Sequence, residues 1–204
     1  MTESMKVWQE MLDKRSLAKY FEGVFNKIGI EVEDTGERFT VIHRSDKFEM
    51  VEGISSDVDY EIKLKAQNIS NMKAHGDDGV INAEESFRIM SVLFTPLTIA
   101  SLQNPVLSQP FFRKLSGIEN HITVYLDHPE TDEYAVHTLI YINKEWIVVP
   151  GAHGHAKRVF RLRPSDAIDY QRQVFTALND GSLKGWQSFK KWYFNWRKSV
   201  SEKR

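Results

Sequence analysis

A chain of 204 residues can bury a core of its own, and its apolar (41%) and charged (27%) fractions are ordinary for globular proteins, which argues against disorder or a membrane-embedded protein. The chain has no cysteine, so disulfides, thiolate catalysis and zinc–cysteine sites are excluded. The net charge of −1 conceals an asymmetry: residues 30–86 hold fourteen acidic and six basic side chains, whereas residues 184–204 hold seven basic and one acidic. An ordinary solvated surface is the favoured interpretation of this asymmetry, with steering of a partner as the alternative.

The N-terminal residues 1–28 predict helices. An apolar pattern at residues 7–12 suggests a first helix within residues 3–15. After Ser16, Leu17, Phe21, Val24 and Ile28 recur at helical spacing, so we expect a second helix that runs to about Ile28, with Gly29 at its C-cap. The first eight residues show no secretory signal, and we expect a cytoplasmic protein.

From Ile30 the period of the apolar residues changes to two, which is typical of strands. Turn chemistry at Thr35-Gly36, Ser45-Asp46 and Gly53 separates the segments and predicts an antiparallel meander. The expected strands are Ile30–Glu33, Glu37–His43, Lys47–Glu52 and Val58–Leu64, and a short helical turn over Gln67–Lys73 follows them.

Residues 86–115 form the most apolar part of the chain. The pattern predicts a helix from about Asn82, interrupted at Pro96 and ending before Pro105, and a short helix from Pro110 to Gly117. The apolar residues of the first of these helices cover nearly its whole circumference and leave only a thin polar stripe around Ser91, Thr95 and Thr98. Such a helix must be covered on every side. The segment is too interrupted for a membrane span and indicates a buried helix, which favours plain core over the wall of a pocket.

More strands and two helices follow the central apolar segment, and the sequence shows no internal repeat. We expect strands at Ile122–Leu126, Tyr134–Ile142 and Trp146–Val149, and a last one in which Val159, Arg161 and Arg163 share a face. A helix should begin at Pro164 and end at Asn179-Asp180-Gly181, and a final aromatic helix should span about Leu183–Val200.

These elements predict one α+β domain over residues 1–204, with N-terminal helices (1–28), a sheet with central apolar helices (30–163) and C-terminal helices (164–204). The sheet is expected to be mostly antiparallel and twisted, with about five to seven strands covered by helices.

The loop Gly151–Arg158 is the most site-like segment. Its glycines permit unusual backbone angles, and His153 and His155 alternate, as two metal ligands might. Backbone N–H groups with Lys157 and Arg158 offer an alternative site for a phosphate or carboxylate. A plain connection between strands is favoured over either function, and no metal is expected there.

Two other segments allow a functional and a structural interpretation. Asp78–Glu85 resembles half of a calcium loop, yet it lacks the first carboxylates, so a capping box of Asn82 and Glu85 is favoured. In the last helix, aromatic residues fall on one face between basic ones, which suits docking on the domain, a membrane surface or, least well, nucleic acid. The candidates for transient membrane contact are Trp186, Phe189, Trp192 and Trp196.

The strands Arg38–Ile42 and Phe48–Gly53, the segment Asp57–Leu64 and the helical turn Ala66–Met72 before a larger apolar helix resemble the sterol carrier protein 2-like family over about residues 36–150. The resemblance implies a β-sheet covered by helices around an apolar tunnel for lipids, in proteins that are mostly not enzymes. The closing part differs, since a long hairpin over Ile122–Val149 and the histidine-rich loop stand where the family has a glycine-rich strand.

The expected function is therefore non-enzymatic binding or transfer of an apolar ligand (lipid, fatty-acyl or sterol-like), without a cofactor. By helix position, Phe87, Met90, Phe94 and Leu97 are the candidate pocket wall. The alternative is a small enzyme or anion-binding protein with its site at the loop Gly151–Arg158. The sequence contains no nucleophile elbow, phosphate loop or dinucleotide fingerprint that would support an enzyme.

Overall fold

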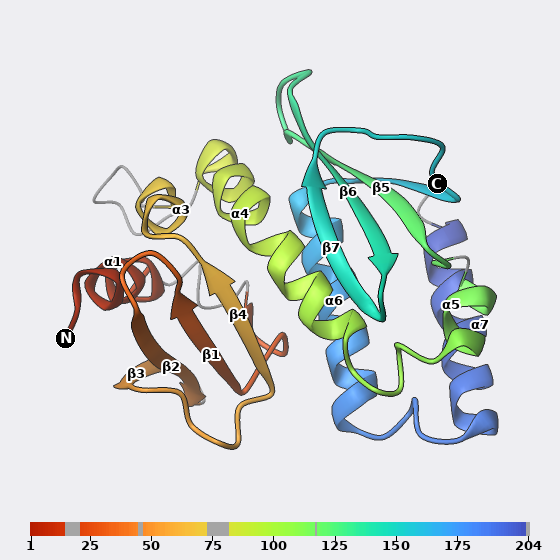
Figure 1. Ribbon diagram of the computed structural model, residues 1–204, viewed down its shortest axis with the longest axis horizontal. Coiled ribbons are helices and arrows are strands. Elements are labelled where there is room, and N and C mark those ends of the chain that lie inside the picture. The colour runs from red at the N-terminus through yellow and green to blue at the C-terminus, as the bar shows by residue number, and fades with distance from the viewer. Residues whose placement is uncertain (15–20, 45–46, 73–81, 117, 203–204) are drawn as a thin grey trace.

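The computed structural model describes residues 1–14, 21–44, 47–72, 82–116 and 118–202, and these form an α+β protein (Figure 1). The described helices are α1 (Glu3–Leu12), α3 (Ala66–Asn71), α4 (Ala83–Leu102), α5 (Pro110–Ser116), α6 (Pro164–Asn179) and α7 (Trp186–Glu202). The strands are β1 (Lys27–Val32), β2 (Glu37–Arg44), β3 (Lys47–Glu52), β4 (Tyr60–Leu64), β5 (His121–Asp127), β6 (Tyr134–Ile142), β7 (Glu145–Pro150) and β8 (Arg158–Leu162). Within the described ranges, no helix is both long and apolar enough to cross a bilayer.

The strands form two mixed sheets of four, where the sequence predicted one mostly antiparallel sheet of five to seven strands. The first sheet has the order β3-β2-β1-β4 and the second the order β7-β6-β5-β8. In each, three strands form an antiparallel meander, and the fourth then crosses over to pair parallel with the first. The expected simple meander is therefore wrong at β4, which pairs with β1 and not with β3. A parallel pair needs a crossover connection, and a tight turn cannot form one.

The two halves of the chain thus repeat one topology. Helix α1 contacts α3 and β3 in the first half, as α4 contacts α6 and β7 in the second. We call Glu3–Asn71 the first repeat and Ala83–Asn179 the second. Corresponding strand pairs have matching registers: Ile30 faces Phe39 in the first repeat as Val124 faces His137 in the second. The helix α7 follows the second repeat and has no described counterpart in the first.

A buried threonine holds the crossover in both repeats. The hydroxyl of Thr40 donates to the carbonyl of Gly53 (2.8 Å) and accepts from the N–H of Ser55 (2.9 Å). Thr138 repeats this arrangement with the carbonyl of Gly151 (2.6 Å) and the N–H of His153 (3.0 Å). The glycine-rich loop after β7 is therefore the crossover connection of the second sheet.

The predicted helix up to Ile28 is wrong at its C-terminal end, because the chain has already entered β1 there. Gly23 has a left-handed φ of +73° after a turn in which the N–H of Val24 bonds to the carbonyl of Phe21, and β1 begins at Lys27. Gly29 lies inside β1, and an added Cβ there would come within 2.7 Å of Ile54 on the crossover. Its small size is required by this close approach and not by a helix C-cap.

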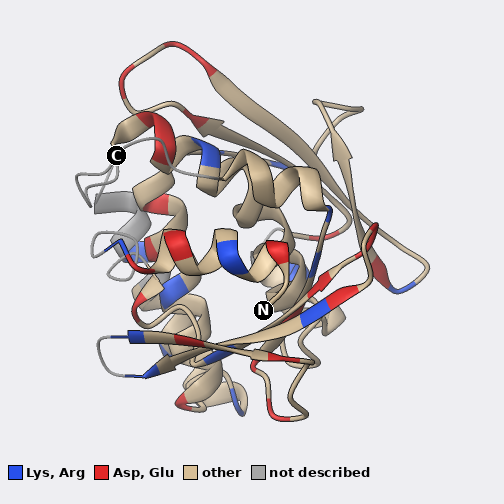
Figure 2. Cartoon of the chain, turned by 90° about the vertical axis from the view of Figure 1, so that its left-hand side faces the viewer, with Lys and Arg blue, Asp and Glu red and all other residues tan. Residues whose placement is uncertain are grey.

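The sheets bury one face each and differ on the other. The outer face of the first sheet carries charges of both signs, since Glu31 lies near Arg38 and Lys63. Figure 2 shows basic and acidic residues along the strands. The corresponding face of the second sheet is more apolar, since Ile142 and Ile147 stand where the first sheet has Arg44 and Glu49. The two repeats therefore share a fold but present different surfaces.

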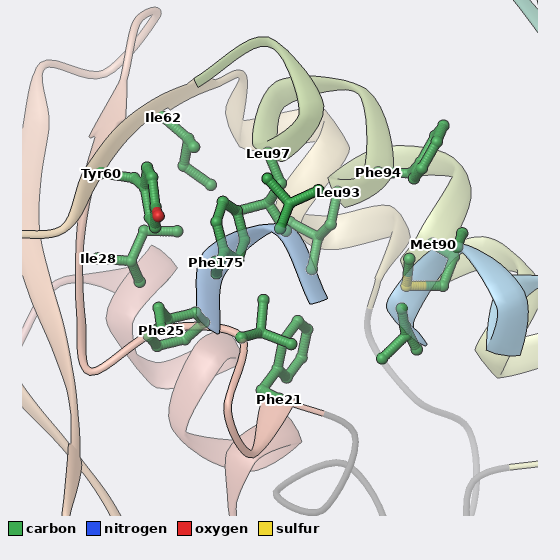
Figure 3. Close-up of a cluster of buried hydrophobic side chains, with 14 of the residues drawn as sticks. Phe21, Phe25, Ile28, Tyr60, Ile62, Met90, Leu93, Phe94, Leu97 and Phe175 are labelled. Carbon is green, nitrogen blue, oxygen red and sulfur yellow. The ribbon is translucent and has the colours of Figure 1, made fainter. Parts of the chain in front are cut away.

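Helix α4 lies between the two sheets (Figure 1) and contacts β4 and α3 of the first repeat and β5, β7 and α6 of the second. This double role accounts for its apolar circumference. In Figure 3, Phe175 of α6 lies between Tyr60 of the first sheet and Leu93 and Leu97 of α4, and the Phe175 and Tyr60 ring centres are 4.1 Å apart. The core is thus continuous across both repeats.

Pro96 does not interrupt α4, contrary to the sequence prediction. The helix is continuous from Ala83 to Leu102 although Pro96 cannot donate a backbone hydrogen bond. Packing of α4 against both repeats supplies the free energy that overrides this local penalty. The capping box predicted at its start is confirmed: the Asn82 side chain accepts from the N–H of Glu85 (2.8 Å), and Glu85 reaches back to Asn82.

Candidate functional site

The four candidate wall residues lie on α4 with different degrees of burial. Met90, Phe94 and Leu97 are almost completely buried. Phe87 is half-buried, and its ring centre lies 5.0 Å from that of His128 in the β5–β6 connection. The four residues therefore follow one helix from a partly open end into the core.

A polar cluster lies in this apolar surrounding where α4 packs against α6. The side-chain amide of Gln171, buried to 2% exposure, donates to the carbonyl of Phe94 (3.1 Å) and to the hydroxyl of Thr98 (3.2 Å). The hydroxyl of Ser101 donates to the carbonyl of Thr98 (2.7 Å). These hydrogen bonds give partners to buried polar groups of α4 in the turns before and after Pro96.

Thr95 is the exception in this polar cluster. Its Oγ1 is buried and has no hydrogen-bond partner among the described residues. A buried hydroxyl without a partner costs about 1–3 kcal/mol, so packing alone does not explain Thr95. The sequence indicated it only as a member of the thin polar stripe of the helix, and Gln171 was not predicted because it comes from a distant segment.

The loop Gly151–Arg158 is organised by its crossover. The N–H groups of Gly151, His153 and Lys157 are bonded to Val136, Thr138 and His121, respectively, and are not available to an anion. The His153 ring is 2.6 Å from the carbonyl of Pro150. The Lys157 ammonium pairs with Glu119 (2.8 Å), which lowers the pKa of that carboxyl through a hydrogen bond and charge attraction.

The remaining candidates in this loop, His155 and Arg158, are exposed. His121 lies beneath the loop, because an added Cβ on Gly154 would come within 3.0 Å of its ring. The described residues contain no group of three His, Asp or Glu side chains placed to hold a metal ion. The calcium-like segment falls largely on residues 73–81, outside the described ranges.

Helix α7, the predicted final aromatic helix, packs on α5 through part of its aromatic face. Phe189 and Tyr193 are buried, and the ring of Phe189 lies 5.1 Å from that of Phe112. The hydroxyl of Tyr193 donates to the carbonyl of Leu115 (3.0 Å), and Trp192 is half-buried near Phe112. Trp186 remains exposed, and the side chain of Trp196 lies outside the described part.

In comparisons with known proteins, no protein family, no curated protein and no solved structure matches the chain.

Proposed function

We propose that the protein binds an apolar ligand without converting it, next to helix α4. The observation that carries the proposal is the Thr95 hydroxyl, which is buried on α4 without a partner among the described residues. An apolar molecule with one polar group, such as a fatty acid or a sterol, would pack against Met90 and Phe94 and bond to this hydroxyl.

Two further arguments support this choice of ligand. Phe87 lies half-buried at one end of the candidate wall, where a ligand would enter from the solvent. The sequence resemblance to sterol carrier protein 2-like proteins points to the same class of ligand.

The test begins with mass spectrometry of an organic extract of the purified, denatured protein. We expect a lipid in a defined molar ratio, and saturable binding of a fluorescent fatty acid by delipidated protein. Phe94→Ala should change the affinity for the fatty acid, whereas Phe39→Ala, an equally buried control in the first sheet, should only lower stability. A folded protein that yields no lipid and does not bind the fatty acid saturably would show that α4 is core alone.

A further inference from the structure

An exposed strip of aromatic and lysine side chains runs along α5 and α7. Phe111 and Trp186 are each 51% exposed, and their ring centres are 4.8 Å apart in an edge-to-face arrangement. Lys190 and Phe194 follow Trp186 at successive i, i+4 positions of α7, and Phe194 is 55% exposed. We call Phe111, Trp186, Lys190 and Phe194 the aromatic–lysine strip.

The strip is what remains exposed after α7 has docked. The neighbouring flank of α7 is occupied by Phe189 and Tyr193, which are only 6% and 9% exposed against α5. Docking therefore fixes the helix and hides part of its aromatic face. Three large aromatic side chains that stay exposed on two neighbouring helices are uncommon on a protein that has no partner for them.

The two segments that carry the strip, α5 and residues 181–201, bear charges of one sign. Residues 181–201 and α5 contain no acidic residue. The exposed lysines Lys114, Lys184, Lys190 and Lys191 lie on these two segments. Such a surface is complementary to a partner that is both anionic and able to receive aromatic rings.

We propose that this strip is a docking surface for an anionic phospholipid bilayer. Aromatic rings on a helix that lies along a membrane enter the interfacial region, where their apolar part is buried and polar groups stay hydrated. Lysine stems lie along the same apolar region while their ammonium groups reach the phosphates. A bilayer fits the strip because exposed aromatic rings and lysines along a helix are the side chains that enter a membrane interface.

This docking surface is independent of the ligand proposed for α4, since it uses other residues and another part of the molecule. Its residues differ from the membrane candidates expected from sequence: Phe189 is buried against α5, and Phe111 and Phe194 are proposed beside Trp186.

The experiment is flotation of the full chain with vesicles of phosphatidylcholine, with and without phosphatidylserine. We expect binding only to the vesicles with phosphatidylserine, and weaker binding as the salt concentration rises. The double variant Phe111→Ala/Trp186→Ala should bind about tenfold more weakly because it loses two interfacial side chains. Tyr134→Ala, which removes an exposed aromatic of β6, is the matched control and should bind as the original chain does.

A second variant, Lys190→Glu/Lys191→Glu, separates charge from aromatic insertion and should remove the preference for phosphatidylserine. Circular dichroism and thermal unfolding confirm that the variants fold. Absence of vesicle binding, equal binding to neutral vesicles, or binding that is unchanged in both double variants would overturn the proposal, as would lysine-dependent binding to single-stranded oligonucleotides alone. The lipid extract of the same variants reports on the α4 site separately, so the two proposals fail independently.

Discussion

His137 is a titratable residue at a position that is apolar in the first repeat. It lies opposite Val124 in the strand pairing, and the corresponding residue of the first sheet is Phe39, which is completely buried. Burial lowers the pKa of His137 below its ordinary value of 6.5, because the charged imidazolium loses hydration. The folded protein therefore takes up a proton here less readily than the unfolded chain does.

The pH dependence of stability follows from this difference. Above pH 6.5 both states hold His137 neutral, and below it the unfolded state binds the proton first, so the free energy of unfolding should fall as the pH drops through this value. Urea titrations between pH 7.5 and pH 5, values at which histidine titrates, measure the effect. His137→Phe should flatten the profile, and an unchanged slope in this variant would refute the assignment.

Thr95 and Thr98 form a matched pair on one helix. The Thr98 hydroxyl accepts from Gln171, whereas the Thr95 hydroxyl has no partner among the described residues. In delipidated protein, Thr98→Val should lower the free energy of unfolding by about 1 kcal/mol or more, because it leaves the Gln171 amide with one acceptor fewer. Thr95→Val should be neutral or stabilising, because it removes a buried hydroxyl that makes no hydrogen bond.

The same pair tests the polar anchor of the proposed ligand. With ligand present, Thr95→Val should weaken the binding of a hydroxyl- or carboxyl-bearing lipid, and Thr98→Val should have the smaller effect. Chemical denaturation and fluorescence titration supply the two measurements. Equal destabilisation of the delipidated protein by both substitutions would mean that the Thr95 hydroxyl has a partner in solution, such as an ordered water.

At the level of elements, the crossover is the feature on which each sheet depends. Thr40 and Thr138 each bridge two backbone groups of a loop that carries the chain across the sheet. Thr40→Val and Thr138→Val should each lower the free energy of unfolding by about 1–3 kcal/mol, since a carbonyl and an N–H lose their partner. Serine at either position keeps the hydroxyl and should restore most of the loss.

These four variants are compared by urea denaturation. Because the two threonines hold corresponding positions, similar losses are expected in both repeats. A valine variant as stable as the original chain would mean that water replaces the hydroxyl at the loop, and the crossover would then need another explanation.

The extent of many elements could be predicted from sequence because the signals are local. The predicted Lys47–Glu52 and Tyr134–Ile142 are the bounds of β3 and β6, where alternation and turn residues set both ends. The pairing of β4 with β1 could not be predicted in this way, since it depends on contacts such as that of Ile54 with Gly29 across the sheet. The repeat was also not evident, because corresponding positions such as Arg44 and Ile142 differ in chemistry.

The candidate sites show the same difference between features set by local sequence and features set by tertiary contacts. The partial docking of the tail and the capping box at Asn82 follow from spacing on a single helix, and the sequence indicated both. The polar cluster joins α4 to Gln171 of α6, and the aromatic–lysine strip joins α7 to Phe111 of α5. Such pairs come from tertiary packing, which a periodicity within one element does not report.

At the scale of the whole molecule, α4 is the element that both repeats share. It belongs to the second repeat by topology, yet it contacts β4 and α3 of the first. Neither repeat can therefore lose α4 without exposing part of its own core. This sharing supports the expectation of a single domain and predicts that the two sheets unfold together.

Leu97 provides the test, because it is completely buried on α4 and faces Phe175 and the first sheet (Figure 3). Leu97→Ala should lower the free energy of unfolding by about 2–5 kcal/mol through loss of buried contacts and formation of a cavity. Native-state hydrogen exchange should then show the slowest amides of β1–β2 and β5–β6 losing protection by the same amount, since both exchange only through global unfolding. Loss of protection confined to the first sheet would show that the repeats are separate folding units, joined but not made cooperative by α4.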